Sequence, residues 1–275
     1  MPNESDPAHG THTSGSYAIA QQDEAARREA QRLDALGRVR DPHSRQVLEA
    51  IGLAPGWKCL EVGGGGGSLA RWMAERVGPQ GQVLSTDIDL RFHTRDAPEA
   101  LEVRLHDITR DPLPRDHFDL SHCRAVLQHV AERERALDRM IEATRPGGFV
   151  VCEDSDFQPF EMQPLPEPFG SVARTMIELS ARARDWDRNV GRRLLALLRE
   201  RGLVELEAVG QAWTMHGGRD SAEWWVLAME HAGPALVAAQ AVEADELADA
   251  IAQARAPGFA VLSPLSMSVR GRKPR

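Results

Sequence analysis

The sequence predicts an α/β fold in which a mostly parallel sheet carries helices on both faces. Three observations lead to this prediction. Strand-like and helix-like patterns alternate five times in about a hundred residues. A run of five glycines, 63–67, joins an apolar strand to a helix. Acidic residues stand at the ends of three successive strands, where open sheets of this kind bind their ligands.

Length, charge and cysteine content narrow the possible classes of protein. The 275 residues are 42% hydrophobic, enough for one large core or for one domain with a substantial insertion. The formal net charge of -8 gives no sign of the basic face that RNA-binding and DNA-binding proteins usually have. No apolar run has membrane-spanning length, and the first residues lack the apolar core of a signal peptide. Three cysteines without metal-like spacing indicate reduced thiols, no metal site and a cytoplasmic protein.

The segment before the first strand is predicted to be a polar tail followed by two helices. Residues 1–16 are polar and are expected to be disordered. A helical pattern runs from 17 to about 40. Asp41 and Pro42 are typical of the start of a second helix, with Asp41 as the N-cap, and Gly52 is expected to end it.

The elements of the sheet follow in order. Strands are expected at 58–62, 82–86, 101–105, 118–123 and 149–153, with helices at 68–77 and 131–144 and with a turn at 145–148 before the fifth strand. The rhythm then changes. Helices are expected at 171–186 and 190–201, a sixth strand at 203–209, two helices in 221–254 broken near Gly233 and Pro234, and a closing strand at 260–269.

The glycine run allows a ligand to lie against the main chain, since glycine has no Cβ and adopts positive φ. The N-terminus of the helix that follows offers free N–H groups at the same place. The dinucleotide fingerprint requires glycine at its first, third and sixth positions, but the sixth position counted from Gly63 is Ser68. A flexible linker is a further alternative, which the apolar strands on both sides disfavour.

The pattern Glu61-x-Gly63-x-Gly65-x-Gly67 resembles motif I of the class I S-adenosylmethionine-dependent methyltransferases. The resemblance implies that S-adenosylmethionine is the cofactor, that S-adenosylhomocysteine is a product, and that Glu61, Gly63, Gly64 and Gly65 bind the cofactor. This cofactor carries a sulfonium and an ammonium group but no phosphate, so a carboxylate at the turn suits it. Relatives often have alanine or cysteine where this chain has Gly64.

Asp87 stands at the end of the second strand, 20 residues after Gly67. A carboxylate there can accept hydrogen bonds from both ribose hydroxyls, a role that NAD enzymes share, and Ile88 is expected to pack on the adenine face. A solvated carboxylate that caps the next segment is the alternative. The resemblance implies that Asp107, after the third strand, holds the adenine amino group and that the backbone of Ile108 adds a second bond. Asp is also common in loops.

Later stretches resemble small-molecule methyltransferases that are frequent in actinobacteria, several of them from natural-product pathways. The stretches are Gly56-Trp57, Arg124-x-x-Leu127-x-His129-Val130, Arg145-Pro146-Gly147-Gly148 and Glu153-Asp154. The resemblance covers about residues 17–155 and implies a Rossmann-like, seven-stranded domain over 53–275, with helical insertions at about 160–186 and 220–256. It also implies that 17–52 form a helical lid over the cofactor, although a surface helix packed by Leu33, Leu36 and Val39 explains the same pattern.

Methyl transfer from a sulfonium requires alignment of the reacting atoms and exclusion of water. A hydroxyl or ammonium acceptor also requires a base, and His129 is our candidate, with His216 as a second. A histidine packed at a helix start is the alternative for His129. Arg124 is expected to contact the cofactor or a substrate acid, or to be a surface cation. The tryptophans of the C-terminal third form an aromatic substrate wall or pack in the core: Trp186, Trp213, Trp224 and Trp225.

The sequence therefore predicts a methyltransferase that acts on oxygen, nitrogen or carbon of a small metabolite, and its apolar, helix-rich insertion is compatible with a homodimer. Two alternatives keep the same fold and cofactor: an enzyme that catalyses a cyclisation or a decarboxylation without methyl transfer, and an inactive partner subunit or sensor. An NAD enzyme is disfavoured by Glu61 and Ser68, and the acidic balance makes RNA a poorer substrate than a protein. We expect Glu61, Asp87 and Asp107 to lie close together at one edge of the sheet.

Overall fold

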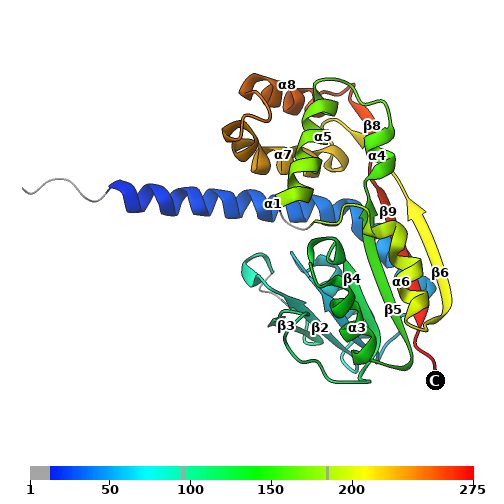
Figure 1. Cartoon of the computed structure of the whole chain (residues 1–275). Coiled ribbons are helices and arrows are strands. Elements are labelled where there is room, and N and C mark those ends of the chain that lie inside the picture. Colours follow the sequence, from blue (N-terminus) through cyan, green and yellow to red (C-terminus); the bar gives the residue numbers. More distant parts are fainter. Residues whose placement is uncertain (1–12, 94–96, 184–185) are drawn as a thin grey trace, which may run out of the picture.

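The computed structural model describes residues 13–93, 97–183 and 186–275 (Figure 1). Its main sheet has seven strands in the order β3-β2-β1-β4-β5-β9-β6. Strands β1 to β5 pair in parallel, and β9 lies antiparallel between β5 and β6. The predicted seven-stranded, mostly parallel sheet is confirmed. The strands are β1 Lys58–Val62, β2 Gln82–Asp87, β3 Leu101–Leu105, β4 Phe118–Arg124, β5 Thr144–Asp156, β6 Val204–Gln211 and β9 Leu265–Arg272.

Helices cover both faces of this sheet, as expected (Figure 1). On one face α1 (Thr13–Ala50) and α2 (Ser68–Val77) bury apolar side chains such as Leu48 and Met73 against β1, β2 and β4. On the other face α3 (Arg133–Ala143) and α6 (Leu194–Glu200) pack on side chains such as Leu60 and Val150. Because side chains alternate along a strand, neighbouring residues of β1 face different helices.

Helix α1 is a single helix from Thr13 to Ala50, and the prediction of a second helix start at Asp41 is wrong. Pro42 lies inside it, where a proline removes one main-chain hydrogen bond. The side chain of Asp41 contacts Arg124 of β4 instead of capping a helix. Tertiary contacts on both sides of Pro42 therefore outweigh the local signal. Helix begins four residues before the expected position 17, and residues 1–12 of the expected tail lie outside the described ranges.

A helical cap stands above the carboxyl ends of the strands (Figure 1). Its elements are α4 Gln158–Met162, α5 Phe169–Ala183, α7 Asp220–Ala238, α8 Ala244–Arg255, β7 Thr214–His216 and β8 Ala260–Leu262. They share an aromatic core with Leu36 and Val39 of α1. The expected closing strand is in fact two strands, since Pro264 separates β8, which pairs with β7, from β9 in the main sheet.

The predicted helix break at Gly233 and Pro234 is wrong, because α7 continues to Ala238. A Cβ at position 233 would lie 2.4 Å from Cδ2 of Leu247 on α8. Glycine therefore permits the close approach of two helices at this position. The expected turn at 145–148 is assigned to β5 but interrupts its pairing, because the register with β4 shifts there and Gly147 has φ 77°.

None of the helices within the described ranges is both long and apolar enough to cross a membrane. All three cysteines are buried and none forms a disulfide.

Candidate cofactor and catalytic site

The glycine turn, residues 63–67, leaves the carboxyl end of β1 and leads directly into α2. The N–H groups of Gly63 and Gly64 donate to the carbonyl oxygen of Thr86 on β2, at 2.7 and 3.1 Å. The N–H of Gly65 donates to Oδ2 of Asp87 at 2.8 Å. These bonds hold the turn against the neighbouring strand, which is not the behaviour of a flexible linker.

Gly63 and Gly64 show why the turn requires glycine. Gly63 has φ 70°, and a Cβ there would lie 2.3 Å from Cγ2 of Val126. A Cβ at Gly64 would lie 2.2 Å from Oγ of Ser85 and 2.9 Å from Nε2 of His93. Ser85 and His93 are themselves hydrogen-bonded at 3.1 Å. Glycine at position 64 therefore leaves room for a histidine that packs against the turn.

Asp87 and Asp107 lie at the same edge of the sheet. Strands β2 and β3 are parallel neighbours, and the N–H of His106 donates to the carbonyl oxygen of Asp87 at 2.9 Å. The carboxylate of Asp107 accepts hydrogen bonds from the hydroxyl and the N–H of Thr109, which lower the pKa of Asp107. Both carboxylates are only partly buried. The structure thus brings together two of the three acidic residues expected at this edge.

The two isoleucines beside these carboxylates differ in exposure. Ile88 is 74% exposed, which is unusual for a large apolar residue. Ile108 is buried in the core between the sheet and α3, so that its main chain is the part that faces the edge. Leu105, opposite Asp87 on β3, is also exposed. An apolar surface therefore adjoins Asp87, as contact with a flat ring requires.

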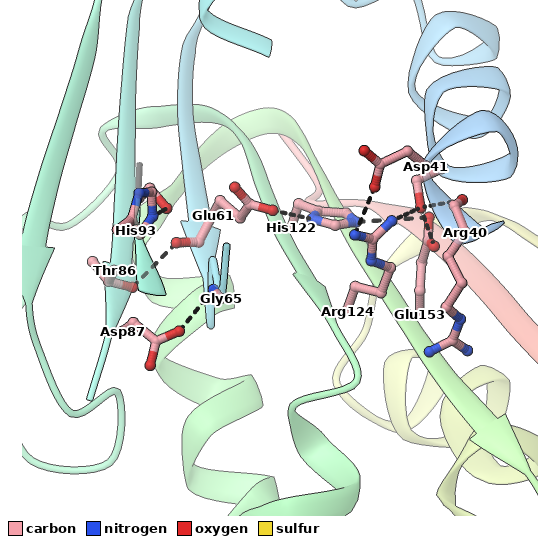
Figure 2. A network of polar contacts seen from close by, with 12 residues as sticks. Arg40, Asp41, Glu61, Gly65, Thr86, Asp87, His93, His122, Arg124 and Glu153 are labelled. Atoms are coloured by element: carbon pink, nitrogen blue, oxygen red, sulfur yellow. Dashed lines mark hydrogen bonds and ion pairs between the residues drawn. The ribbon is translucent and has the colours of Figure 1, made fainter. Parts of the chain in front are cut away.

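The carboxyl group of Glu61 points into the sheet face that α1 covers (Figure 2). Its Oε1 lies 3.9 Å from Nδ1 of His122 on β4, and its Oε2 is buried without a hydrogen-bond partner. Burial raises the pKa of Glu61 to about 7, because His122 and Arg124 offset the desolvation only in part. Glu61 is therefore buried beneath α1, whereas Asp87, which is close enough to act on its pKa, is partly exposed.

His122 is fully buried between two carboxyl groups. Its Nε2 lies 3.6 Å from Oε1 of Glu153 on β5, on the side away from Glu61. Burial alone would raise the pKa of Glu153, but His122, Arg124 and Ser44 outweigh it and lower the pKa to about 2. The two carboxyl groups beside one imidazole thus have pKa values shifted in opposite directions.

Arg124 reaches from the end of β4 to helix α1. Its Nη2 donates to Oδ1 of Asp41 at 2.8 Å and its Nη1 donates to Oγ of Ser44 at 3.0 Å. The hydroxyl of Ser44 donates to Oε2 of Glu153 at 2.7 Å. The guanidinium expected at the cofactor or at a substrate acid is therefore engaged by α1. We call these linked side chains the α1–sheet network: Asp41, Ser44, Glu61, His122, Arg124 and Glu153 (Figure 2).

Helix α1 also crosses the glycine turn. A Cβ at Gly65 would lie 3.8 Å from Cδ2 of Leu33, and a Cβ at Gly37 would lie 3.1 Å from Oγ of Ser68. The helix therefore passes directly over the turn and over the first residue of α2. This is the position that the lid hypothesis requires.

His129 ends the short helix η2 (Leu127–His129), just beyond β4. Its side chain is exposed, hydrogen-bonded to the amide of Gln128 at 2.9 Å and stacked on Trp186 at 6.1 Å between ring centroids. His216, the second candidate, is exposed on β7 of the cap. Trp224 and Trp225 are buried in the cap core, so packing accounts for these two tryptophans.

Asp154 is a second titratable group, and it contacts the short helix that carries His129. It is fully buried near the end of β5, where Oδ2 accepts the N–H of Leu127 at 3.2 Å and Oδ1 has no hydrogen-bond partner. Burial raises the pKa of Asp154 to about 7, and the opposing effect of Arg40 from α1 is smaller. A carboxyl group with such a pKa is suited to proton transfer near neutral pH.

Sequence reasoning missed Ser44 and His122 as members of the site. A histidine inside the otherwise apolar strand pattern of 118–123 was the available signal for His122. Ser44 gives no local signal, since its partner Glu153 is 109 residues away in the chain.

The family comparison matches the description "Methyltransferase domain" to residues 60–152, from β1 to β5. This range contains the glycine turn and Asp87, Asp107 and His122.

Relatives match stretches of the chain that are slightly longer than a hundred residues. The chain is 36% identical over 108 residues to the ubiquinone/menaquinone biosynthesis C-methyltransferase UbiE of Laribacter hongkongensis, which is 37% of this chain and 44% of that protein. It is 34% identical over 117 residues to an uncharacterised 37.1 kDa protein in a transposon of Streptomyces fradiae, which is 40% of this chain and 34% of that protein. The chain thus spans about half or less of the length of the relatives it matches.

Solved structures are similar over most of the chain. Phosphoethanolamine N-methyltransferase 2 of Haemonchus contortus, in complex with S-adenosyl-L-methionine, has a TM-score of 0.53 and 17% identity over 85% of this chain and 53% of that one. The [4+2]-cyclase SpnF has a TM-score of 0.50 and 18% identity over 85% of this chain and 81% of that one. At such identities the likeness concerns the fold alone.

Proposed function

We propose that this chain, whose residues 60–152 form a methyltransferase domain of the class I, S-adenosylmethionine-dependent type, transfers a methyl group to oxygen, nitrogen or carbon of a small molecule. One observation carries the proposal. The glycine turn is hydrogen-bonded to the end of β2 through Thr86 and Asp87, and helix α1 covers it. A bare main chain, a carboxylate and a cover are together what a nucleoside with a reactive sulfonium requires.

The residues present fit this cofactor in charge and in shape. The buried Oε2 of Glu61 has no hydrogen-bond partner. A buried carboxylate is stabilised most by a cationic group, which this cofactor would supply. The turn offers no Cβ atoms from Gly63 to Gly67. No phosphate-binding cation is needed, which agrees with the two carboxylates, Asp87 and Asp107, at this edge of the sheet. The fit therefore favours a cationic nucleoside over a dinucleotide.

We assign roles to the chain's own residues as follows. Asp87 accepts hydrogen bonds from the ribose, Asp107 and the main chain of Ile108 bind the adenine edge, and Ile88 packs on its face. Gly63, Gly64 and Gly65 allow close approach of the amino-acid part, whose charge Glu61 balances. The cofactor supplies a methyl group on a positively charged sulfur, which departs as a neutral thioether. Helix α1 is the lid that keeps water from the site, and Arg124 acts by holding that lid.

A protic acceptor also needs a base, and two groups near the end of β4 qualify. His129 is exposed and can exchange protons with solvent. Asp154 is buried, and its Oδ1 has no partner. Both groups lie close to Leu127. His129 belongs to the same short helix as Leu127, and Asp154 accepts a hydrogen bond from the N–H of Leu127.

We also propose the origin of the acceptor, the cellular environment of the protein and its oligomeric state. Motifs shared with actinobacterial small-molecule methyltransferases support an acceptor from natural-product biosynthesis. Three buried cysteines without a disulfide support the reducing environment of the cytoplasm. A homodimer is supported by exposed apolar residues of the cap, Met162 on α4 and Leu262 on β8.

Asp87→Asn is expected to weaken S-adenosylhomocysteine binding about 10- to 100-fold, because two hydrogen bonds to a charged acceptor become bonds to a neutral amide. Calorimetry measures the loss. Asp89→Asn is the matched control, since Asp89 lies two residues further on and pairs with Arg91 in solvent. Equal affinities of the two variants would remove Asp87 from the site, and failure of the unchanged protein to bind would end the proposal.

Asp154→Asn and His129→Ala are expected to differ in turnover. The variant of the group that takes the proton should lose about 100-fold or more in kcat, while S-adenosylhomocysteine affinity stays within about twofold. The measurement is the mass gain of one methyl group in a panel of phenols, alcohols and amines. Full turnover in both variants would show that the reaction needs neither base. Turnover without a mass gain would favour a cyclisation or a decarboxylation.

A further inference from the structure

We infer that His122 is a positioning residue that links docking of helix α1 to the charge on Glu61, so that the cofactor meets a carboxylate only when the helix is in place. The inference deepens the proposed function and rests on it. His122 and Ser44 act through Glu61 and Glu153, which they contact. The link runs along the α1–sheet network (Figure 2).

The network contains one continuous line of contacts from α1 to β1. The hydroxyl of Ser44 donates to Glu153 at 2.7 Å, Glu153 lies 3.6 Å from one ring nitrogen of His122, and the other ring nitrogen lies 3.9 Å from Glu61. Each step joins a different element, in the order α1, β5, β4 and β1. In this line His122 is the residue that both carboxyl groups share.

The contacts of His122 with the two carboxyl groups matter because all three side chains are buried. His122 and Glu153 are at most 1% exposed, and Glu61 is 3% exposed. Both ring nitrogens, Oε1 of Glu153 and Oε2 of Glu61 have no hydrogen bond within the described part of the chain. Charges in such a place are poorly screened, so a change at one carboxyl group is felt strongly at the other. One imidazole ring therefore lies beside two buried acids.

Helix α1 decides which of the two acids the imidazole favours. Ser44 donates to one carboxylate oxygen of Glu153, and Arg124, which Asp41 holds against the helix, also favours the anion of Glu153. With these groups in place Glu153 remains an anion with less dependence on the imidazole, which can then favour the Glu61 carboxylate. Without them Glu153 competes for the imidazole, and Glu61 becomes the neutral acid.

The other charged groups around Glu61 come from three elements. Arg124 of β4 favours its carboxylate, while Asp41 of α1 and Asp87 of β2 disfavour it. Because Arg124 also donates to Ser44, the variant Ser44→Ala tests both contacts of this hydroxyl together.

The test compares S-adenosylhomocysteine binding in three variants by calorimetry, from about pH 6 to about pH 9. Ser44→Ala and Glu153→Gln change opposite ends of the Ser44–Glu153 hydrogen bond. If one of these variants folds poorly, the other still tests the role of this bond. His43→Ala is the matched control. His43 neighbours Ser44 on α1 and bonds Ser268 of β9 at 2.9 Å, so it docks the same helix without entering the network.

Ser44→Ala is expected to bind about tenfold more weakly near neutral pH, through the loss of hydrogen bonds to charged groups, and to regain affinity as the pH rises. Glu153→Gln removes the competing acid, so its affinity should depend less on pH and should not fall in parallel with that of Ser44→Ala. His43→Ala should bind within about twofold of the unchanged protein at every pH.

Two results would overturn the inference. Equal losses in Ser44→Ala and His43→Ala, with parallel pH profiles, would show that helix docking alone matters. Unchanged binding in Ser44→Ala and in Glu153→Gln would show that the contacts are only structural. Failure of the unchanged protein to bind S-adenosylhomocysteine is a different outcome, since it would end the proposed function and, with it, the role of Glu61.

Discussion

Gly63→Ala is expected to lower the free energy of unfolding by roughly 2–6 kcal/mol and to abolish cofactor binding. Gly63 has φ 70°, a conformation that costs a residue with a Cβ about 1–3 kcal/mol. The new Cβ would also lie 2.3 Å from Cγ2 of Val126, which forces the turn or β4 to move. Either movement breaks the bond from Gly63 to Thr86 that sets the shape of the turn.

Denaturant unfolding and S-adenosylhomocysteine calorimetry measure this effect. Gly66→Ala is the matched control, because it lies in the same turn, has no positive φ and would bring its Cβ within 4 Å of no other atom. Its stability should change by less than about 1 kcal/mol. If the two variants were equally stable, the turn would be free to rearrange and the steric account of it would be wrong.

Glu61→Gln is expected to remove most of the pH dependence of cofactor affinity around neutral pH. Burial raises the pKa of Glu61 from 4.5 to about 7, so the folded protein holds a proton there that it must release before a carboxylate can meet a cation. Affinity of the unchanged protein should therefore rise as the pH increases through about 7. The glutamine variant cannot ionise, and its affinity should be lower above that pH and nearly constant.

The same group affects stability in the opposite direction. A carboxyl group whose pKa is raised in the folded state stabilises the protein fully below the pKa of the unfolded chain, near 4.5, and loses this effect as the pH rises to about 7. The loss amounts to ~3 kcal/mol. Asp154 acts in the same sense, so the difference between the unchanged protein and Glu61→Gln is the quantity to measure. Parallel unfolding curves from about pH 5 to about pH 8 would contradict the assignment.

The sequence was sufficient for the sheet because its signals are local. Alternating apolar strands and helices identified β1 to β4 to within a residue or two, and the glycine run placed the start of α2 at Ser68. The same local logic failed at Asp41 and Pro42, where a helix-start signal lies inside a continuous helix. It failed there because Arg124, more than 80 residues later in the chain, binds Asp41.

In the candidate site, too, local patterns placed some residues correctly, while the surroundings of others depend on distant parts of the chain. Asp87 and Asp107 follow strands, and parallel pairing alone brings such residues to one edge. The direction of the Glu61 side chain depends on what covers the sheet, and no pattern within 58–62 reveals that His122 and α1 lie there. Gly64 is a similar case, because the positions of His93 and Ser85 leave no room for a side chain there.

Two neighbouring arginines of helix α1 bind different parts of the protein, one the cap and the other the main sheet. Arg38 pairs with Asp220 at the start of α7 in the cap, and two residues later Arg40 donates to Ser155 and Ser266 of the sheet. Because no hinge separates these anchors, the cap and the sheet edge cannot shift relative to each other without straining the same half-turn of helix. Any opening that admits a substrate must therefore release one anchor first, and the solvent-exposed Arg38–Asp220 pair is the weaker of the two.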